Sequence, residues 1–290
     1  MLPEAKREDL VYASDVDLKE VFVLSLATGK VVGALSFRDL PWGLCSGGSG
    51  HVFVAHFRLR AVPGTITEFG HGNPDPISSR TLPAGESGAC SVDARSGDIA
   101  VTSGGAPRGG NTVSIFAAPL QKKTLPRVVD APGTLAAVLY CAYDNRGNLF
   151  FTPVAYSTGP MLDVLEPGSK SLITINFNGD QFAGGPLQWQ EAYLATSSLP
   201  AIQQVTVSEG NGEITGTAQL RRVNNKDFGA NQFWIQDGEI VAPFGCPTEN
   251  CRVKGDKLGV WTYPKGRLVK VFSGFGARAL FGVTLSKAPR

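Results

Sequence analysis

Cys45, Cys90 and Cys141 occupy matching places in a short segment that recurs along the chain, at residues 41–46, 87–93 and 139–144. The cysteines are 90 − 45 = 45 and 141 − 90 = 51 residues apart. This is the period of one blade of a β-propeller rather than of a helical array. The spacing therefore predicts an all-β fold built from similar units.

Each unit has the pattern of four short strands separated by breaks rich in Gly or Pro. In the units that contain Cys90 and Cys141, Asp93 and Asp144 open the turn after the first strand. Gly97 and Gly147 follow in these turns, where the backbone needs a positive φ. The strands expected in these units are residues 89–93, 98–102, 112–117 and 124–129, then 139–144, 148–152, 161–166 and 171–177.

Two further units are more diverged. Leu187 and Phe233 stand where the cysteines stood, at intervals of 187 − 141 = 46 and 233 − 187 = 46 residues. The expected strands are residues 187–190, 192–196, 202–207 and 213–220, then 233–236, 239–242, 258–263 and 268–272.

The two ends of the chain complete one more unit. The N-terminal part supplies only three strands, at residues 10–14, 20–25 and 30–36, and the C-terminal part supplies one, at residues 280–286. If they join, Val283 falls at the repeat position and the ring closes without open sheet edges. We therefore predict a single domain over residues 1–290, a six-bladed β-propeller with four antiparallel strands per blade and a flexible tail at residues 1–9.

The pattern Cys-x-x-Asp-x-x-Gly-Asn-Leu-Phe, which runs from Cys141 to Phe150, resembles the inner hairpin of NHL-type six-bladed propellers. More narrowly, the chain resembles uncharacterised extracytoplasmic propeller proteins of soil bacteria. The turn at residues 47–50 departs from this pattern because it has no Asp. The resemblance implies a fold and brings no catalytic residue with it.

Composition excludes several partners. With 35 Gly, 19 Pro and only 18% charged residues, the chain suits short strands and tight turns. A net charge of +2 gives no electrostatic footprint for nucleic acid or an anionic membrane. No apolar run approaches the roughly 18 residues of a membrane span. The charged residues 4–9 leave no room for a signal peptide, so this start is either a cytoplasmic terminus or one trimmed after secretion.

The three repeat-position cysteines are interpreted as packing residues. Their equivalents in the other units are Leu, Phe and Val, and a free cysteine behaves in a core as a small hydrophobe. Placement in different blades is expected to separate the thiols. Cys246 and Cys251 instead lie in one irregular loop, where a local disulfide is the preferred interpretation. That disulfide favours an extracytoplasmic location, periplasmic or secreted, with the cytoplasm left open.

No metal or cofactor is predicted. Six-bladed lactonase-type hydrolases, which the fold resembles, hold a divalent cation with carboxylates and amides that converge on the axis. The residues that flank the repeat position include no Asp or Glu; those after it are Ser46, Ser91, Ala142, Gln188, Trp234 and Thr284. Asp93 and Asp144 are expected to cap their own turns. His51 and His56 begin and end one strand, so a three-histidine zinc site with His71 is not expected.

The remaining candidate for a functional surface is one face of the ring. It is made by the loops that enter the inner strands and the loops between second and third strands. Trp, Tyr and Arg are enriched at interaction hot spots, and the candidate ligand-binding residues on this face are Trp42, His56, Arg58, Arg60, Arg108 and Tyr156. The leading hypothesis is a monomeric binding module for a protein, peptide or glycan. The alternative is a hydrolase or lyase at the mouth of the central channel, with His56 as general base and Asp15 as its orienting partner.

Overall fold

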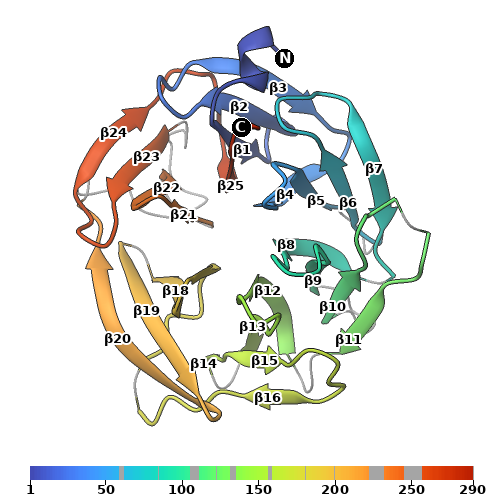
Figure 1. Ribbon diagram of the computed structural model, residues 1–290, viewed down its shortest axis with the longest axis vertical. Helices are drawn as coiled ribbons and strands as arrows, with labels where there is room; N and C mark the ends of the chain where they lie inside the picture. The colour runs from blue at the N-terminus through green and yellow to red at the C-terminus, as the bar shows by residue number, and fades with distance from the viewer. Residues whose placement is uncertain are drawn as a thin grey trace.

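The protein is a closed ring of six β-sheet blades around a central axis (Figure 1). The computed structural model describes residues 1–289 except 59–61, 84, 105–110, 122, 131–134, 156–158, 180, 199, 222–231 and 245–256. Each blade is a twisted antiparallel sheet whose first strand lies nearest the axis. The predicted six-bladed architecture with four antiparallel strands per blade is confirmed.

Six blades follow one another around the ring. Blade 1 contains β25 (Leu280–Ser286), β1 (Leu10–Asp15), β2 (Glu20–Ser25) and β3 (Val31–Ser36); blade 2 contains β4 (Leu40–Ser46), β5 (Val52–Phe57), β6 (Thr65–Phe69) and β7 (Pro76–Thr81); blade 3 contains β8 (Glu86–Val92), β9 (Ile99–Gly104), β10 (Thr112–Phe116) and β11 (Arg127–Asp130). Blade 4 contains β12 (Leu135–Tyr143), β13 (Leu149–Ala155), β15 (Asp163–Leu165) and β16 (Leu172–Thr174), with the short β14 (Gly159–Pro160) beside β13; blade 5 contains β17 (Leu187–Gln190), β18 (Tyr193–Ser198), β19 (Ala201–Ser208) and β20 (Asn211–Gln219); blade 6 contains β21 (Trp234–Gln236), β22 (Glu239–Phe244), β23 (Lys257–Thr262) and β24 (Leu268–Phe272).

The last strand of the chain closes the ring. β25 pairs antiparallel with β1, and the register places Ala13 opposite Val283 and Leu10 opposite Ser286. Blade 1 is therefore assembled from both ends of the chain, as the sequence predicts. The bounds of β2 and β25 agree with the expected ranges, residues 20–25 and 280–286.

The hydrophobic core is divided among the blade junctions. Six clusters of buried apolar side chains are found in the described residues, and each joins two neighbouring blades. Between blades 1 and 2, for example, Tyr12 and Val21 pack against Leu44 and Val54. Successive side chains of a strand point to opposite sides of its sheet. Each blade can therefore present apolar side chains to both of its neighbours.

The hairpin turns that carry Asp93 and Asp144 are capped as expected. Asp93 Oδ1 accepts the backbone N–H of Arg95 at 2.9 Å, and Asp144 Oδ1 accepts the N–H groups of Arg146 and Asn148, each at 2.8 Å. These contacts satisfy turn backbone groups that the ladder leaves unpaired.

The N-terminal segment differs from the flexible tail expected for residues 1–9. It contains a 3₁₀-helix, η1 (Pro3–Lys6), and the side chain of Ala5 is fully buried. The backbone N–H of Leu2 donates to the carbonyl of Val32 at 2.6 Å, which ties the segment to the outer strand of blade 1.

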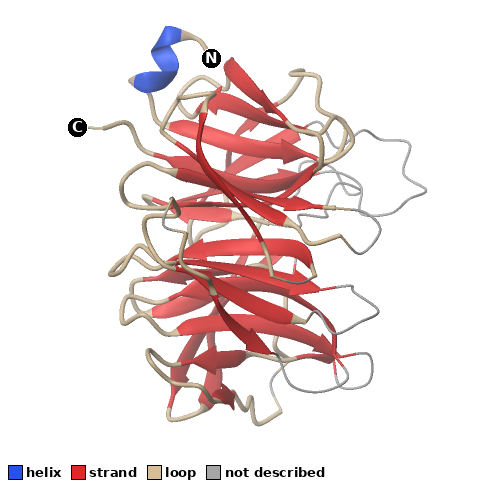
Figure 2. Ribbon diagram, turned by 90° about the vertical axis from the view of Figure 1, so that its right-hand side faces the viewer, coloured by secondary structure: helices blue, strands red, loops and turns tan. Residues whose placement is uncertain are grey.

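The ring has two distinct faces. The tight turns after the inner strands, η1 and the C-terminal end lie on one face, on the left in Figure 2; we call it the turn face. Its opposite, the loop face, carries the beginnings of the inner strands and the ends of β1 and β5.

Candidate binding site on the loop face

Three aromatic rings meet at the loop-face end of the axis. The indole of Trp42 contacts the rings of both Phe57 and Phe281, with centroid distances of 5.1 Å and 3.8 Å and interplanar angles of 27° and 37°. They come from β4, β5 and β25, so the cluster spans blades 1 and 2. Because all three side chains are only partly buried, the cluster offers a preformed apolar surface to a ligand.

The backbone around Trp42 is irregular and closely packed. The register between β4 and β5 shifts between Pro41 and Leu44, which marks a bulge at Trp42 and Gly43. The buried hydroxyl of Ser14 donates to the Trp42 carbonyl at 3.0 Å and accepts the N–H of Gly282 at 2.7 Å. Ser14 thus fixes the backbone beside two of the three rings, and bulges commonly redirect a side chain at a functional site.

A positively charged hollow adjoins the aromatic cluster. It has a volume of about 410 Å³ and shares Phe57 with the cluster; its other lining residues are Lys19, Arg38, Asp39, Leu40, Arg58 and Val62. Three basic and one acidic side chain give 3 − 1 = +2 charges around an apolar floor. Arg58 Nε donates to Asp39 Oδ2 at 2.6 Å, and both side chains stay about one-third exposed at 36% and 30%. The ion pair therefore holds Arg58 in place and leaves it accessible.

Two of the residues predicted for this face are brought together. Trp42 stacks on Phe57, and Phe57 and Arg58 line the same hollow. Phe57 and Phe281 were not predicted as site residues. Phe57 is the last residue of β5 and Phe281 the second residue of β25, so both lie at loop-face ends of strands. Arg60, Arg108 and Tyr156 lie outside the described residues.

His56 is buried beneath the site. Its side chain is 4% exposed, its Nε2 lies 3.0 Å from Thr67 Oγ1, and its ring lies 4.5 Å from that of Phe37. Burial lowers the pKa of His56 to about 4, with a smaller opposing effect from Asp39. The imidazole is therefore neutral near pH 7 and has little access to a ligand.

Asp15 acts as the cap of a turn. Its Oδ1 accepts the backbone N–H groups of Asp17 and Leu18, at 3.0 Å and 2.9 Å. Its Oδ2 accepts those of Arg278 and Ala279, at 2.5 Å and 3.1 Å. Asp15 and His56 both lie in the described part of the chain, where no hydrogen bond or ion pair joins them. Their role as a catalytic pair stays a prediction.

The repeat positions line a pocket on the axis. Cys45, Cys90, Cys141, Leu187 and Phe233 all border a cavity of about 230 Å³. The recurring segment therefore identifies the innermost strands, as the sequence indicates.

Polar side chains beside this cavity connect neighbouring blades. Ser46 Oγ donates to the carbonyl of Leu285 at 2.6 Å, and Ser91 Oγ accepts the N–H of Tyr143 at 3.0 Å. The amide of Gln232 reaches across the axis. Its Oε1 accepts the N–H groups of Leu44 and Val283, at 3.1 Å and 3.3 Å, and its Nε2 donates to the Leu44 carbonyl at 2.6 Å. These groups are engaged in holding the ring together.

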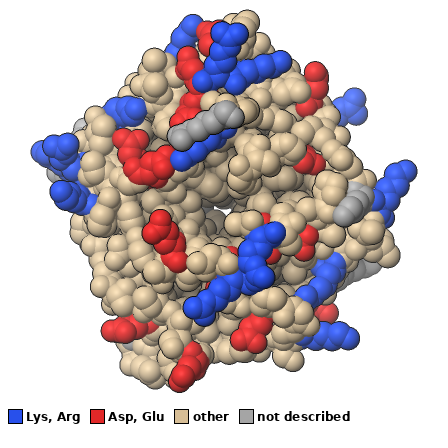
Figure 3. All heavy atoms as spheres, in the orientation of Figure 1, with Lys and Arg blue, Asp and Glu red and all other residues tan. Residues whose placement is uncertain are grey.

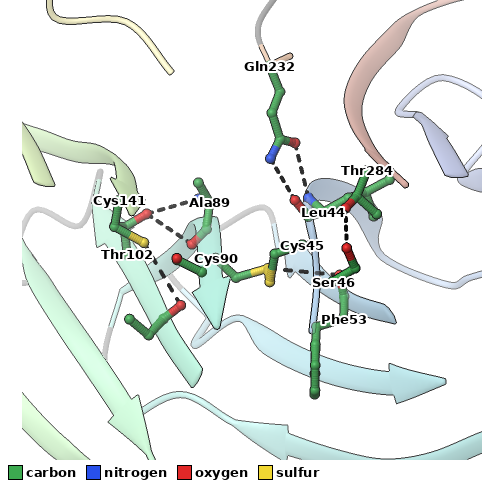
Figure 4. Close-up of a disulfide and its surroundings, with 12 residues drawn as sticks. Leu44, Cys45, Ser46, Phe53, Ala89, Cys90, Thr102, Cys141, Gln232 and Thr284 are labelled. Carbon is green, nitrogen blue, oxygen red and sulfur yellow. Dashed lines mark hydrogen bonds between the residues drawn. A yellow bond between two sulfur atoms is a disulfide. The ribbon is translucent and has the colours of Figure 1, made fainter. Parts of the chain in front are cut away.

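Cys45 and Cys90 form a disulfide, and the expectation that their blades would separate the thiols is wrong (Figure 4). The inner strands converge at the axis so closely that a Cβ at Gly43 would lie 2.5 Å from the carbonyl oxygen of Gly88. The two Cα atoms are 5.6 Å apart, within the range that a disulfide can bridge. The disulfide therefore joins blade 2 to blade 3.

The other cysteines have different environments. Cys141 is a free, buried thiol at the equivalent position of blade 4, and burial raises its pKa. Its interpretation as a packing residue agrees with this burial. Cys246 and Cys251, for which a local disulfide is predicted, lie outside the described residues.

The three histidines are kept apart by separate partners. His51 Nδ1 lies 2.7 Å from Glu68 Oε1, and His71 Nδ1 lies 2.7 Å from Ser286 Oγ. Within the described ranges, no group of three or more His, Cys, Asp or Glu side chains is arranged to hold a metal ion. The same ranges contain no helix long and apolar enough to cross a membrane.

Comparison with protein-family profiles gives no match, and comparison with curated proteins gives none. Solved structures do match. A chain in the crystal structure of a nidogen/laminin complex is 11% identical with a TM-score of 0.67, over 97% of this chain and 100% of that chain. A protein of unknown function from Bacteroides caccae is 12% identical with a TM-score of 0.65, over 96% and 99%. A functionally unknown protein from Desulfotomaculum acetoxidans is 10% identical with a TM-score of 0.59, over 97% and 100%. These similarities extend to the fold alone.

Proposed function

We propose that this protein is a binding module that recognises a protein or peptide segment on its loop face. The observation that carries the proposal is the half-buried cluster of Trp42, Phe57 and Phe281 beside the Arg58–Asp39 pair. Aromatic and arginine side chains supply most of the binding free energy in many interfaces. A bound glycan would use the same ring surface, and the experiment below separates the two.

Preorganisation supports this choice. Ser14 fixes the backbone at Trp42 and Gly282, and Asp39 orients Arg58. Little side-chain freedom is then lost on binding, which favours affinity. One of the similar propellers belongs to a nidogen/laminin complex, an example of this fold in a protein assembly. The Cys45–Cys90 disulfide supports a location in an oxidising, extracytoplasmic compartment.

The test is a parallel screen of a phage-displayed peptide library and a glycan array with wild-type protein and variants. Trp42→Ala should weaken binding of the selected ligands by about 2 kcal/mol or more, and the surface variant Arg58→Ala by about 1 kcal/mol. Phe275→Ala is the matched control, because Phe275 is half-buried and packs on Phe22 in the hydrophobic cluster between blades 1 and 6. Urea unfolding establishes that each variant is folded. Ligands that bind wild type and both site variants equally would refute the proposed site.

A further inference from the structure

The turn face has its own large hollow, between blades 4 and 5. This groove has a volume of about 750 Å³ and shares Asp144, Asn145 and Trp189 with the axial cavity. Figure 3 shows this face, with acidic side chains around its lower part. The groove is on the opposite side of the ring from Trp42, so it is independent of the site proposed above.

The floor of the groove is apolar. Phe150 and Val164 are buried there, and the ring of Phe150 is parallel to the indole of Trp189 at a centroid distance of 6.1 Å. Ile173 also lines the groove and is 39% exposed, so part of its side chain is open to a ligand. Ligand side chains placed over Ile173 and Trp189 would remove apolar surface from water.

The rim of the groove is negatively charged. Glu166, Glu191 and Glu209 occupy three different hairpin turns and are exposed, and their carboxylates have no hydrogen-bond or ion-pair partner among the described residues. Together with Asp144 and one basic residue, Arg146, the lining carries 1 − 4 = −3 charges.

The rim is also held in a fixed geometry. The N–H of Asn176 donates to the Gly210 carbonyl at 3.0 Å, and the N–H of Gly212 donates to the Asn176 carbonyl at 2.9 Å. These bonds connect blade 4 to the turn of blade 5 that carries Glu209. The turn that carries Glu209 is therefore held against blade 4 before a ligand arrives.

We infer that this groove is a second binding site, and that it accepts an extended peptide segment in which Lys or Arg alternates with apolar residues. The basic side chains would pair with Glu191 and Glu209 on the rim. The apolar side chains would pack on Ile173 and Trp189, and a cation near the indole face gains a further attraction.

The probe is a fluorescein-labelled hexapeptide of alternating Lys and Leu, with termini blocked, and binding is measured by fluorescence anisotropy. Alternating Glu-Leu and alternating Lys-Ser hexapeptides test charge and apolar content separately. The Glu191→Gln/Glu209→Gln variant should weaken Lys-Leu binding about three- to tenfold, with the loss shrinking at higher salt. Glu213→Gln is the matched control, because Glu213 is an exposed acid of blade 5 outside the groove. It should leave the affinity unchanged.

Trp42→Ala should also leave the affinity for the Lys-Leu peptide unchanged, which distinguishes failure of this groove from failure of the loop-face site. The inference is overturned if the double variant binds as tightly as wild type, or if Glu213→Gln weakens binding to the same degree. Equal binding of the Glu-Leu peptide would show simple apolar adhesion, and equal binding of the Lys-Ser peptide would show that the floor takes no part. Either result also overturns it.

Discussion

Cys45 and Cys90 are bonded to each other across the junction of two blades, although 45 residues of chain separate them. The bond encloses the three outer strands of blade 2 and the beginning of β8 in blade 3 in one covalent loop. Its position at the axis means that the two inner strands cannot separate when the outer strands loosen.

The first prediction concerns this bond. The Cys45→Ala/Cys90→Ala variant should lose about 2–4 kcal/mol of unfolding free energy, because the loop no longer restricts the unfolded chain. Cys141→Ala is the control: it truncates the equivalent buried thiol and should cost only about 1 kcal/mol. Urea unfolding monitored by circular dichroism measures both. Equal losses in the two variants would contradict the prediction.

The second prediction concerns Ser14. Ser14→Ala should cost about 1–3 kcal/mol, because it leaves the Trp42 carbonyl and the Gly282 N–H without their partner. The ¹⁹F resonance of fluorotryptophan at Trp42, assigned with Trp42→Phe, should shift. Ser36→Ala, on an exposed outer strand, should change neither quantity. An unmoved Trp42 resonance in the Ser14 variant would show that the hydroxyl does not position the ring.

The third prediction concerns pH. The pKa of His56 is near 4 in the folded state and near 6.5 in the unfolded state, so the unfolded chain takes up a proton first as pH falls. The stability that neutral His56 contributes is therefore complete above about pH 6.5 and is lost between about pH 6.5 and 4. Between about pH 7 and pH 5, wild type should lose about 2 kcal/mol more than His56→Gln. His71, whose pKa is also lowered by burial, contributes equally to both proteins and cancels. Parallel pH dependences in the two proteins would disprove this assignment.

The fourth prediction concerns Gln232. Gln232→Met keeps most of the volume but leaves two N–H groups and one carbonyl of blades 1 and 2 without their partner. Unfolding free energy should fall by about 2–4 kcal/mol. Gln219→Met, on the exposed outer strand of blade 5, provides the comparison and should have a small effect. If both substitutions cost the same, the bridge across the axis adds no stability.

Much of the fold can be read from the sequence because the repeat records strand position. The cysteine spacing locates the inner strands, and the unpaired strand at residues 280–286 can only complete the three strands at the other end. Asp93 and Asp144 cap their turns by local contacts, which a local pattern can reveal.

The disulfide was missed for a physical reason. Periodicity gives the place of Cys45 and Cys90 along their strands, and comparison with Leu187 and Phe233 correctly shows that this place is buried. The periodicity carries no information on the distance between neighbouring inner strands. That distance depends on blade geometry and on the small residues Gly43 and Gly88.

The candidate site was predicted only in part, for a similar reason. Trp42 and Arg58 were assigned to the correct face from their positions at strand ends. Phe281 was not associated with them, because its contact with Trp42 depends on closure of the ring by β25. The acidic groove was missed because its glutamates come from turns that are adjacent only in three dimensions.

Closure by β25 also gives the protein a particular order of assembly. The inner edge of β1 is complete only when a strand 280 − 15 = 265 residues later in the chain has been synthesised. At about 5–20 residues per second, that edge stays open for tens of seconds. During this interval it can pair with the β25 of another copy, so exchange of that strand between two rings is the assembly error to which this architecture is most exposed.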